Sequence, residues 1–391
     1  MLNFFFRLLS REWAGLLIAA VLTLSLLAVV QGMRLASDEL RSALSLAALT
    51  PGILLSLAAL FHLYQHARIW RVLPPTGRLI DIGGYRVHVL AEGEAPVGAP
   101  AVVWFAGGHA GGFAVHHLHR AMRKETRSIL VDRPGTGWSD TGPFPRTTAR
   151  EAEEVVLALA RAGEKGPFIW AGHSFGGLLC ANIARRHPKL VHTLVLLDPT
   201  PLETILFGPR FEAIREMQRT ALLGGIAQLF GIDLSAIERK KQAADPNYSK
   251  IIAATDAVLG PEVLALRDLD ARAGAHFAQA SIFSELSPEG AAACAFETVV
   301  YDGDLGNMPV LLVGPQNDID VQALPELNTG DEAHGQFVRR RVAATRERYM
   351  AISTRSRRIV APEGTGHNFI YEVPEWVVGV FREHCLAGSQ A

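Results

Sequence analysis

The sequence predicts an α/β protein in which a mostly parallel central sheet is flanked by helices, with a pair of apolar helices in front of it. Three observations predict this fold class. Short apolar runs end at polar or glycine-rich loops, an amphipathic helical pattern stands between two of them, and the first 70 residues contain two long stretches without Lys, Arg, Asp or Glu. Strands that are apolar on both faces belong in parallel sheets whose faces are covered by helices.

The two N-terminal stretches, residues 13–30 and 42–63, are long enough to be transmembrane helices. A helix needs about 20 apolar residues to cross the hydrocarbon layer of a bilayer. Pro51 and Gly52 interrupt the second stretch, which membrane helices tolerate better than soluble ones. We therefore expect residues 1–70 to anchor the chain in a lipid bilayer. A signal peptide is the alternative for the first stretch, and a buried or membrane-surface helix is the alternative for the second.

Basic residues predict the orientation of this anchor, since cytoplasmic flanks carry an excess of Lys and Arg. The outer flanks of the two stretches carry Arg7, Arg11, Arg68, Arg71 and Arg78. The connection between the stretches carries only Arg34 and Arg41. Both ends of the anchor, and with them the large domain, are therefore expected on the cytoplasmic side. If only the first stretch spans the membrane, the same rule puts the large domain outside.

Short β-type runs follow the anchor. The segment RLIDIGGYRVHVL alternates in polarity on both sides of Gly83 and Gly84, which is typical of a β-hairpin. The later runs are AVVWFAG, RSILVDR, PFIWAG, HTLVLLD, MPVLLVG and RRIVAPEG. The segment TAREAEEVVLALARAG has apolar residues at three-to-four spacing and ends at Gly163, which predicts a crossover helix. These elements place the α/β core in residues 75–200 and 305–391.

Residues 201–304 interrupt the predicted core. They separate a strand that ends at Asp198 from one that begins near Met308, and about a hundred residues are too many for a simple crossover. The segments FEAIREMQRTALLGGIAQLFGIDL and PEVLALRDLDARAGAHFAQASIFSEL have helical patterns. We therefore expect a helical cap above the carboxyl edge of the sheet.

A single serine stands between two glycines in the segment WAGHSFGGLL. The spacing is Gly172-x-Ser174-x-Gly176, and it follows the apolar run FIW and opens the helical stretch FGGLLCANIARRHP. Glycines at these two positions allow a strand to turn sharply into a helix without side-chain collisions. Such a turn lifts the serine hydroxyl above the carboxyl edge of the sheet, so Ser174 is the candidate nucleophile.

A serine hydroxyl needs a base to take its proton, and the base needs an acid to hold its tautomer. His367 lies just after the last predicted strand, in a glycine-containing loop, and is the candidate base. Asp318 follows the run MPVLLVG and gives the chain order serine, aspartate, histidine, so it is the candidate acid. Asp320 is its nearest rival and Glu363 a more distant one. An ordinary loop histidine and solvated carboxylates are the alternative interpretations.

From about residue 75 onward the chain resembles the α/β-hydrolase superfamily. The segments PPTGRLIDIGGYRVHVL, DRPGTGWSDTGPFPRT, GPFIWAGHSFGG and GTGHNFIYEVPE are similar to those of bacterial membrane-tethered serine hydrolases. The resemblance implies a nucleophile elbow at Ser174, a base at His367, an acid in the loop that holds Asp318, and a bacterial inner-membrane location. The acid loop GPQNDID departs from the commoner spacing, which falls on Asn317.

The loop after the run VVWF is the candidate oxyanion site. Many relatives have a His-Gly pair there, whereas this chain has Ala106 and Gly107. Backbone N–H groups bind the oxyanion in such a site, so the missing imidazole need not abolish it. We expect the N–H groups of Gly108 and Phe175 to be the donors, with His109 replacing Gly108 if the loop is shifted by one residue. A flexible loop that binds no ligand is the alternative.

Composition and motifs narrow the function. The formal net charge is −1, so no strong field attracts nucleic acid. The sequence contains no dinucleotide-binding fingerprint or P-loop, so no cofactor is implied. Cys180, Cys294 and Cys385 are scattered, which predicts neither a disulfide framework nor a metal site. The serine motif and the resemblance imply a serine hydrolase that works through an acyl-enzyme. The expected membrane anchor favours a small-molecule, lipophilic carboxylic ester as its substrate.

Several alternatives remain open for this function. Acyl transfer to an alcohol, amide hydrolysis and perhydrolysis would use the same residues, whereas epoxide hydrolases and haloalkane dehalogenases of the superfamily carry an aspartate nucleophile. A catalytically silent ligand-binding fold and an N-terminal interaction module are alternatives from other classes. An apolar stripe of the predicted cap either forms its core, lines an acyl pocket or contacts the bilayer. It contains Leu222, Leu223, Ile226, Leu229 and Phe230.

Overall fold

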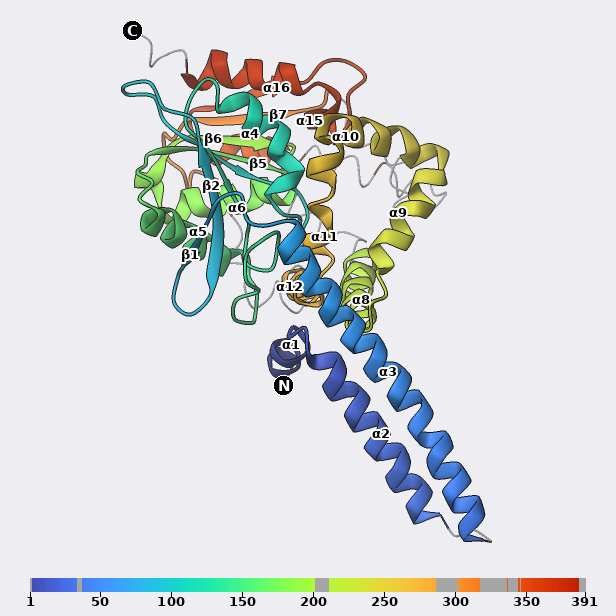
Figure 1. The fold of residues 1–391 in the computed structure, drawn as a ribbon. Helices are drawn as coiled ribbons and strands as arrows, with labels where there is room; N and C mark the ends of the chain where they lie inside the picture. Colours follow the sequence, from blue (N-terminus) through green and yellow to red (C-terminus); the bar gives the residue numbers. More distant parts are fainter. Residues whose placement is uncertain are drawn as a thin grey trace.

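The structure is a computed structural model of the 391-residue chain. It describes residues 2–33, 37–200, 211–285, 300, 302–316, 336, 344 and 346–386. Figure 1 shows a helical hairpin that projects from the domain near the N-terminus, a sheet covered by helices, and a further group of helices beside the base of the hairpin.

An eight-stranded sheet forms the centre of the described chain, in the order β1-β2-β4-β3-β5-β6-β7-β8. The β1–β2 and β2–β4 pairs are antiparallel, and the other pairs are parallel. The strands are β1 (Arg78–Asp81), β2 (Arg86–Glu92), β3 (Val102–Phe105), β4 (Ser128–Val131), β5 (Phe168–His173), β6 (Val191–Leu197), β7 (Val310–Gly314) and β8 (Ser356–Val360). The predicted mostly parallel sheet and its leading hairpin are confirmed.

Helices cover both faces of this sheet. On one face α5 (Thr148–Ala162) and α6 (Phe175–Arg186) pack with the strands, and on the other α4 (His116–Met122) and α16 (Pro374–Phe381) do so. Every residue of β3, β4 and β5 is buried, which explains why these runs are apolar at successive positions. The predicted crossover helix is α5, which ends at Gly163 with a φ of 85°.

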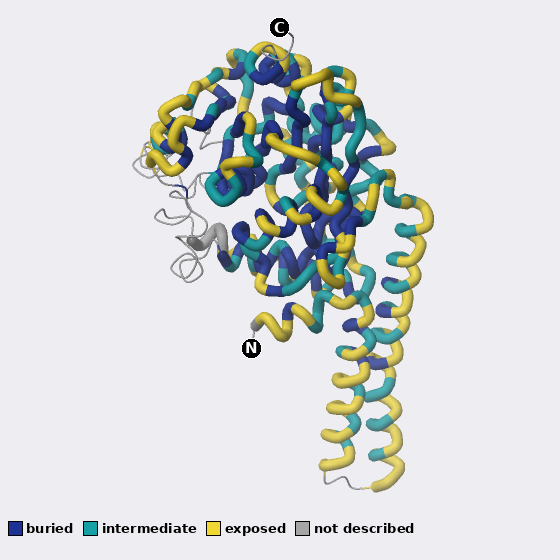
Figure 2. Tube along the Cα trace, turned by 90° about the vertical axis from the view of Figure 1, so that its left-hand side faces the viewer, coloured by how far each residue is buried: buried dark blue, intermediate teal, exposed yellow. Residues whose placement is uncertain are grey.

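Two long apolar helices form the hairpin, α2 (Ala14–Gly32) and α3 (Asp38–Val72). Both are long and apolar enough to cross a membrane. They pack closely, since a Cβ added to Gly52 would lie 1.8 Å from the hydroxyl oxygen of Thr23. Figure 2 shows that most of the hairpin's outward residues are exposed. The hairpin therefore presents a long apolar surface to its surroundings.

Helices also follow β6 and precede β7, and we call them the inserted helices. They are α8 (Phe211–Gln228), α9 (Leu234–Ala244), α10 (Pro246–Leu264), α11 (Arg267–Asp270) and α12 (Ala273–Glu285). α8 packs along α12, and the N-terminal helix α1 (Leu2–Leu9) packs on α12 as well. Residues 201–210, 286–299 and 301 lie outside the described residues, and the bounds of the predicted 201–304 insertion stay a prediction.

A buried ion pair fixes the start of α5 to the loop before it. Arg146 is fully buried, and its Nη1 donates to Oε1 of Glu154 at 2.9 Å. Its Nη2 donates to the other oxygen of Glu154. The hydroxyl of Tyr85 donates to Oε1 of the same carboxylate at 2.6 Å. Loss of this carboxylate would leave the buried guanidinium with Glu151, whose Oε1 is 3.7 Å from Nη2, as its only nearby carboxylate among the described residues.

Replacement of Glu154 by alanine is therefore expected to destabilise the protein by about 3–5 kcal/mol. Glu153→Ala is the matched control, because the Glu153 side chain is 54% exposed although it contacts Arg186 and His187. Exposed ion pairs are worth about 0–1 kcal/mol, so the control should change little. Thermal unfolding of both purified variants measures the difference, and equal Tm values for the two would contradict the burial of the pair.

Candidate active site

The turn between β5 and α6 is very tight. β5 runs directly into Ser174, which adopts a φ of 52° and a ψ of −119°, and α6 begins at the next residue. A Cβ on Gly172 would lie 2.2 Å from the carbonyl oxygen of Gly176. A Cβ on Gly176 would lie 2.6 Å from the carbonyl oxygen of Phe105 in β3. Neither glycine has room for a side chain, so the strand and helix approach closely enough to hold Ser174 in this conformation.

Backbone hydrogen bonds hold Ser174 on both sides. Its N–H donates to the carbonyl oxygen of Leu197 at 3.0 Å, and its own carbonyl accepts from the N–H of Thr200 at 3.0 Å. The Ser174 Oγ is partly exposed and lies 3.3 Å from the hydroxyl oxygen of Thr200. The predicted strand, turn and helix around Ser174 are therefore present, with the hydroxyl at the carboxyl edge of the sheet.

His367 lies in the loop between β8 and α15 (Phe369–Glu372). Its Nδ1 is 2.6 Å from Oδ2 of Asp198, the residue that follows β6. Burial acts to raise the pKa of Asp198, but the hydrogen bond from His367 and its charge outweigh burial and hold that pKa below its usual value. Asp198 is therefore ionised and accepts the Nδ1–H, which leaves Nε2 of His367 as the proton acceptor.

Asp198 is not among the acids expected from the sequence. Asp318 and Asp320 lie outside the described residues, so the pairing of either with His367 stays a prediction, and Glu363 is exposed. The strand order indicates that Asp198 lies near the nucleophile, because β6 runs parallel to β5 and next to it. Carboxyl ends of adjacent parallel strands meet at the same edge of a sheet, so a carboxylate directly after β6 lies beside the nucleophile turn.

The residue before the nucleophile holds the histidine loop. The Nε2–H of His173 donates to the backbone carbonyl of His367 at 2.8 Å, and the two ring centres lie 4.7 Å apart. Burial, followed by the proximity of His367, lowers the pKa of His173 to about 3. The His173 imidazole is therefore neutral and positions His367 without adding a charge. No direct hydrogen bond joins Ser174 to His367 in the described chain, and such bonds often tighten only when substrate binds.

Arg133 connects the two predicted oxyanion donors. This side chain is 1% exposed and donates from Nη2 to the carbonyl oxygen of Gly108 at 2.5 Å. Its guanidinium carbon lies 5.2 Å from the centre of the Phe175 ring. Gly108 has a φ of 54°, a conformation that favours glycine. Phe175 is the first residue of α6, where N–H groups lack intrahelical acceptors and suit a negative charge.

The loop that holds Gly108 adjoins the nucleophile. A Cβ on Gly107 would lie 3.0 Å from the Cβ of Ser174 and 2.9 Å from Nδ1 of His173. His109, the predicted alternative donor, is buried, and neither of its ring nitrogens has a partner among the described residues. Burial, with the nearby Arg133, lowers the pKa of His109 well below its usual value. His109 is therefore neutral, and its role stays a prediction.

A carboxylate from the inserted helices fastens them to the loops of the site. Asp270, the last residue of α11, accepts from the N–H of Gly111 at 2.7 Å and from the N–H of Gly137 at 2.6 Å. Gly111 belongs to the predicted oxyanion loop, and Gly137 belongs to the DRPGTGW loop after β4. Burial raises the pKa of Asp270 to about 6, against the lowering effect of these two hydrogen bonds.

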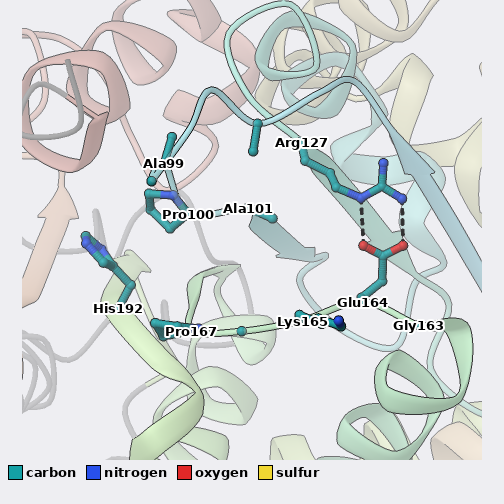
Figure 3. Close-up of a pocket in the computed structure, with 12 residues that line it drawn as sticks. Ala99, Pro100, Ala101, Arg127, Gly163, Glu164, Lys165, Pro167 and His192 are labelled. Atoms are coloured by element: carbon teal, nitrogen blue, oxygen red, sulfur yellow. Dashed lines mark hydrogen bonds and ion pairs between the residues drawn. The ribbon is translucent and has the colours of Figure 1, made fainter.

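A pocket of about 400 Å³ lies away from these residues (Figure 3). It is lined by the segments just before β3, β4 and β5 and by His192 near the start of β6. Arg127 and Glu164 form a bidentate ion pair at its wall, at 2.6 and 2.7 Å. Because β3, β4, β5 and β6 are parallel, their amino ends lie at the edge of the sheet opposite to Ser174. This pocket is therefore separate from the candidate active site.

These features define a class of protein. The strand order, the serine on the β5–α6 turn and the histidine after β8 are those of an α/β-hydrolase fold. The model of the "Alpha/beta hydrolase family" matches residues 98–380. The chain therefore belongs to this family.

Solved structures share this fold. An esterase from Thermogutta terrifontis is 18% identical with a TM-score of 0.53, and the alignment covers 78% of this chain and 95% of that one. Cfl2 from Burkholderia cenocepacia is 21% identical with a TM-score of 0.55, covering 80% and 97%. At these identities the likeness concerns the fold alone.

Among curated proteins, 2-(acetamidomethylene)succinate hydrolase of Mesorhizobium japonicum is 28% identical over 171 residues, which are 44% of this chain and 56% of that protein. The uncharacterized protein YbdG of Bacillus subtilis is 28% identical over 157 residues, which are 39% and 47%. The chain thus spans about half the length of these curated relatives.

A substitution at the elbow tests its close packing. Gly172→Ala is expected to destabilise the protein by about 1–3 kcal/mol or more, because the new methyl group meets backbone atoms of α6 that cannot move alone. Gly379→Ala is the matched control, since nothing lies within 4 Å of a Cβ added there in α16. The control is expected to be neutral or to stabilise by up to about 1 kcal/mol. Thermal unfolding compares them, and an unchanged Tm for Gly172→Ala would contradict the packing.

The pH dependence of stability tests Asp270. Its folded pKa of about 6 lies above the ordinary carboxyl value of 3.8, so the folded state binds this proton more tightly than the unfolded chain does. The resulting stability is fully present below the ordinary value and is lost as the pH rises through 6. Asp270→Asn does not titrate, so wild type minus variant stability should fall between about pH 4 and 7. Unfolding measured across this range checks the sign, and a constant difference would show that the proton is not bound as described.

Proposed function

We propose that this chain is a membrane-anchored serine hydrolase that cleaves a lipophilic carboxylic ester through an acyl-enzyme. The observation that carries the proposal is the Asp198–His367 pair at 2.6 Å, at the sheet edge where Ser174 stands on the elbow. A serine, a histidine and a buried carboxylate are the groups that nucleophilic acyl transfer requires. Family membership supports the hydrolase class, and the arrangement of Ser174, His367 and Asp198 supports a serine mechanism.

The proposed reaction proceeds in two halves. Ser174 Oγ attacks the carbonyl carbon of the ester while Nε2 of His367 takes the hydroxyl proton, and Asp198 stabilises the imidazolium that forms. The tetrahedral intermediate then collapses, and the departing alkoxide leaves as the alcohol with the proton from His367. Water next attacks acyl-Ser174 with His367 again as the base. This second half releases the carboxylic acid and restores the serine.

We assign the stabilisation of the negative charge that develops on the carbonyl oxygen to the backbone N–H groups of Gly108 and Phe175. Arg133 supports this assignment because it contacts both residues, through the Gly108 carbonyl and the Phe175 ring. A loop held from behind by a buried guanidinium needs no reorganisation when the charge appears, which is the condition for efficient electrostatic stabilisation.

The α2–α3 hairpin supports the proposal that the chain is anchored in a membrane. The anchor in turn supports lipophilic esters as substrates. α2 and α3 have the length and hydropathy of spanning helices, and only 17% and 11% of their most apolar windows are buried. A soluble core helix would bury most of such a surface. The basic flanks favour a cytoplasmic position of the hydrolase domain. Because the anchor keeps the site beside a bilayer, lipophilic esters are the proposed substrates.

Kinetics of four variants tests this proposal. With p-nitrophenyl esters of short and medium chain length, Ser174→Ala, His367→Ala and Asp198→Asn are expected to lower kcat/KM by about 10³–10⁴-fold. Asp318→Asn is the comparison that assigns the acid and should retain activity within a few-fold. Thermal unfolding of each variant separates lost chemistry from lost folding.

The outcomes discriminate between the assignments. Retained activity in Ser174→Ala would overturn the serine mechanism. A large loss in Asp318→Asn with little loss in folded Asp198→Asn would transfer the acid role to Asp318. A folded wild type that turns over no ester or amide but binds these compounds would favour a silent ligand-binding fold.

A further inference from the structure

The N-terminal helix α1 has one buried and one exposed aromatic face. Phe6 is 2% exposed and stacks on Phe144, with ring centres 5.5 Å apart, and it also contacts Phe277 of α12. Phe4 is 66% exposed and Phe5 is 48% exposed. Phe6 therefore holds α1 against the inserted helices, while Phe4 and Phe5 stay exposed and meet each other edge to face, with ring centres 6.0 Å apart.

This helix lies where the hairpin leaves the domain. α2 begins at Ala14, a few residues after α1 ends, so the chain passes from α1 directly into the apolar hairpin. Figure 1 shows α1 nearly end-on while the hairpin runs across the view, and Figure 2, turned by 90°, shows α1 lying across the hairpin direction. If the hairpin spans a bilayer, α1 is therefore parallel to the membrane plane at its surface.

The C-terminal end of α8 also lies at the base of the hairpin. A Cβ on Gly15 of α2 would lie 2.5 Å from the carbonyl oxygen of Leu229, and a Cβ on Gly231 would lie 3.1 Å from the ring of Phe61 in α3. This end of α8 and the turn after it thus touch the base of the hairpin. They expose three more apolar side chains, Leu223 at 49%, Ile226 at 42% and Ile232 at 49%.

We propose that these exposed residues form one membrane-contact surface, composed of Phe4, Phe5, Leu223, Ile226 and Ile232, whose partner is the phospholipid bilayer that holds the hairpin. Continuity with the hairpin argues for this partner, since the same chain enters the apolar phase at the next helix. Arg7 and Arg11 beside the surface are exposed and complement anionic headgroups. Aromatic side chains on a helix that lies in the interface are typical of this mode of binding.

The surface is connected to the candidate active site by the inserted helices. α1 packs on α12, and Ala278 of α12 stands against the DRPGTGW loop, where a Cβ on Gly135 would lie 2.5 Å from its Cβ. Arg272, just before α12, donates to the carbonyl oxygen of Gly137 at 2.8 Å. The inserted helices therefore sit between the bilayer and the site. If the chain is the proposed ester hydrolase, this arrangement favours esters dissolved in the membrane as its substrates.

The experiment uses the full chain reconstituted in phosphatidylcholine–phosphatidylglycerol vesicles. Phe5→Trp reports contact with lipid through quenching by brominated phospholipids, and Val97→Trp is the control, because Val97 is 100% exposed on the β2–β3 loop. After subtraction of the wild-type signal, the tryptophan at position 5 is expected to be quenched strongly and the one at position 97 hardly at all. This readout does not depend on catalysis.

The second readout compares two esters. The double variant Phe4→Asp/Phe5→Asp is expected to lower kcat/KM for a long-chain ester dissolved in the vesicles about tenfold, with little change for a water-soluble short-chain ester. Val97→Asp should change neither rate.

Quenching at position 5 no greater than at position 97, or an equal change toward both esters in the double variant, would overturn the membrane-contact surface. Failure of the wild type to hydrolyse either ester would instead overturn the proposed function, and the quenching result would still decide the surface.

Discussion

The close packing of α6 on the ends of β3 and β5 is the constraint on which the rest of the site depends. Gly172 and Gly176 face each other and the carbonyl oxygen of Phe105 at distances that exclude even a methyl group. This packing forces Ser174 into a positive φ and directs α6 with its N-terminus toward the site. One local arrangement thus presents the hydroxyl, leaves a backbone N–H for a developing oxyanion, and sets the edge at which the other catalytic loops meet.

Buried polar groups hold those loops in place. Asp132, at the end of β4, accepts from the N–H of Gly112 at 2.6 Å and from the N–H of Trp138 at 3.0 Å, so it joins the predicted oxyanion loop to the DRPGTGW loop. Its pKa is lowered overall, since His88 and these N–H groups outweigh the raising effect of burial. Asp270 makes the same connection from the inserted helices. Two buried carboxylates, Asp132 and Asp270, thus each accept N–H groups from both loops and hold the loops together.

The sheet, the elbow and the position of the base were predictable because each depends on local pattern. Successive apolar residues reveal buried parallel strands, and a serine two residues from each of two glycines between a strand and a helix reveals the elbow. The partner of the base was not predictable in this way. Carboxylates after β6 and after the next strand both satisfy the chain order, and the choice depends on which loop reaches His367. In the structure Asp198 contacts His367 and adopts a left-handed backbone conformation with a φ of 43°. The order of residues along the chain does not predict this conformation. Helix α1 could not be predicted from the sequence, because eight residues are too few to form a stable helix alone. Packing of Phe6 on the inserted helices stabilises it.

The proposed chemistry depends on a Ser174 hydroxyl that His367 activates. The most direct measurement is covalent labelling of the full chain with a fluorophosphonate, with the modified peptide located by mass spectrometry. We expect a single adduct on Ser174, absent in Ser174→Ala and formed far more slowly in His367→Ala. A folded wild type that remains unlabelled by a probe small enough to enter the site, or an adduct at another residue, would contradict this chemistry.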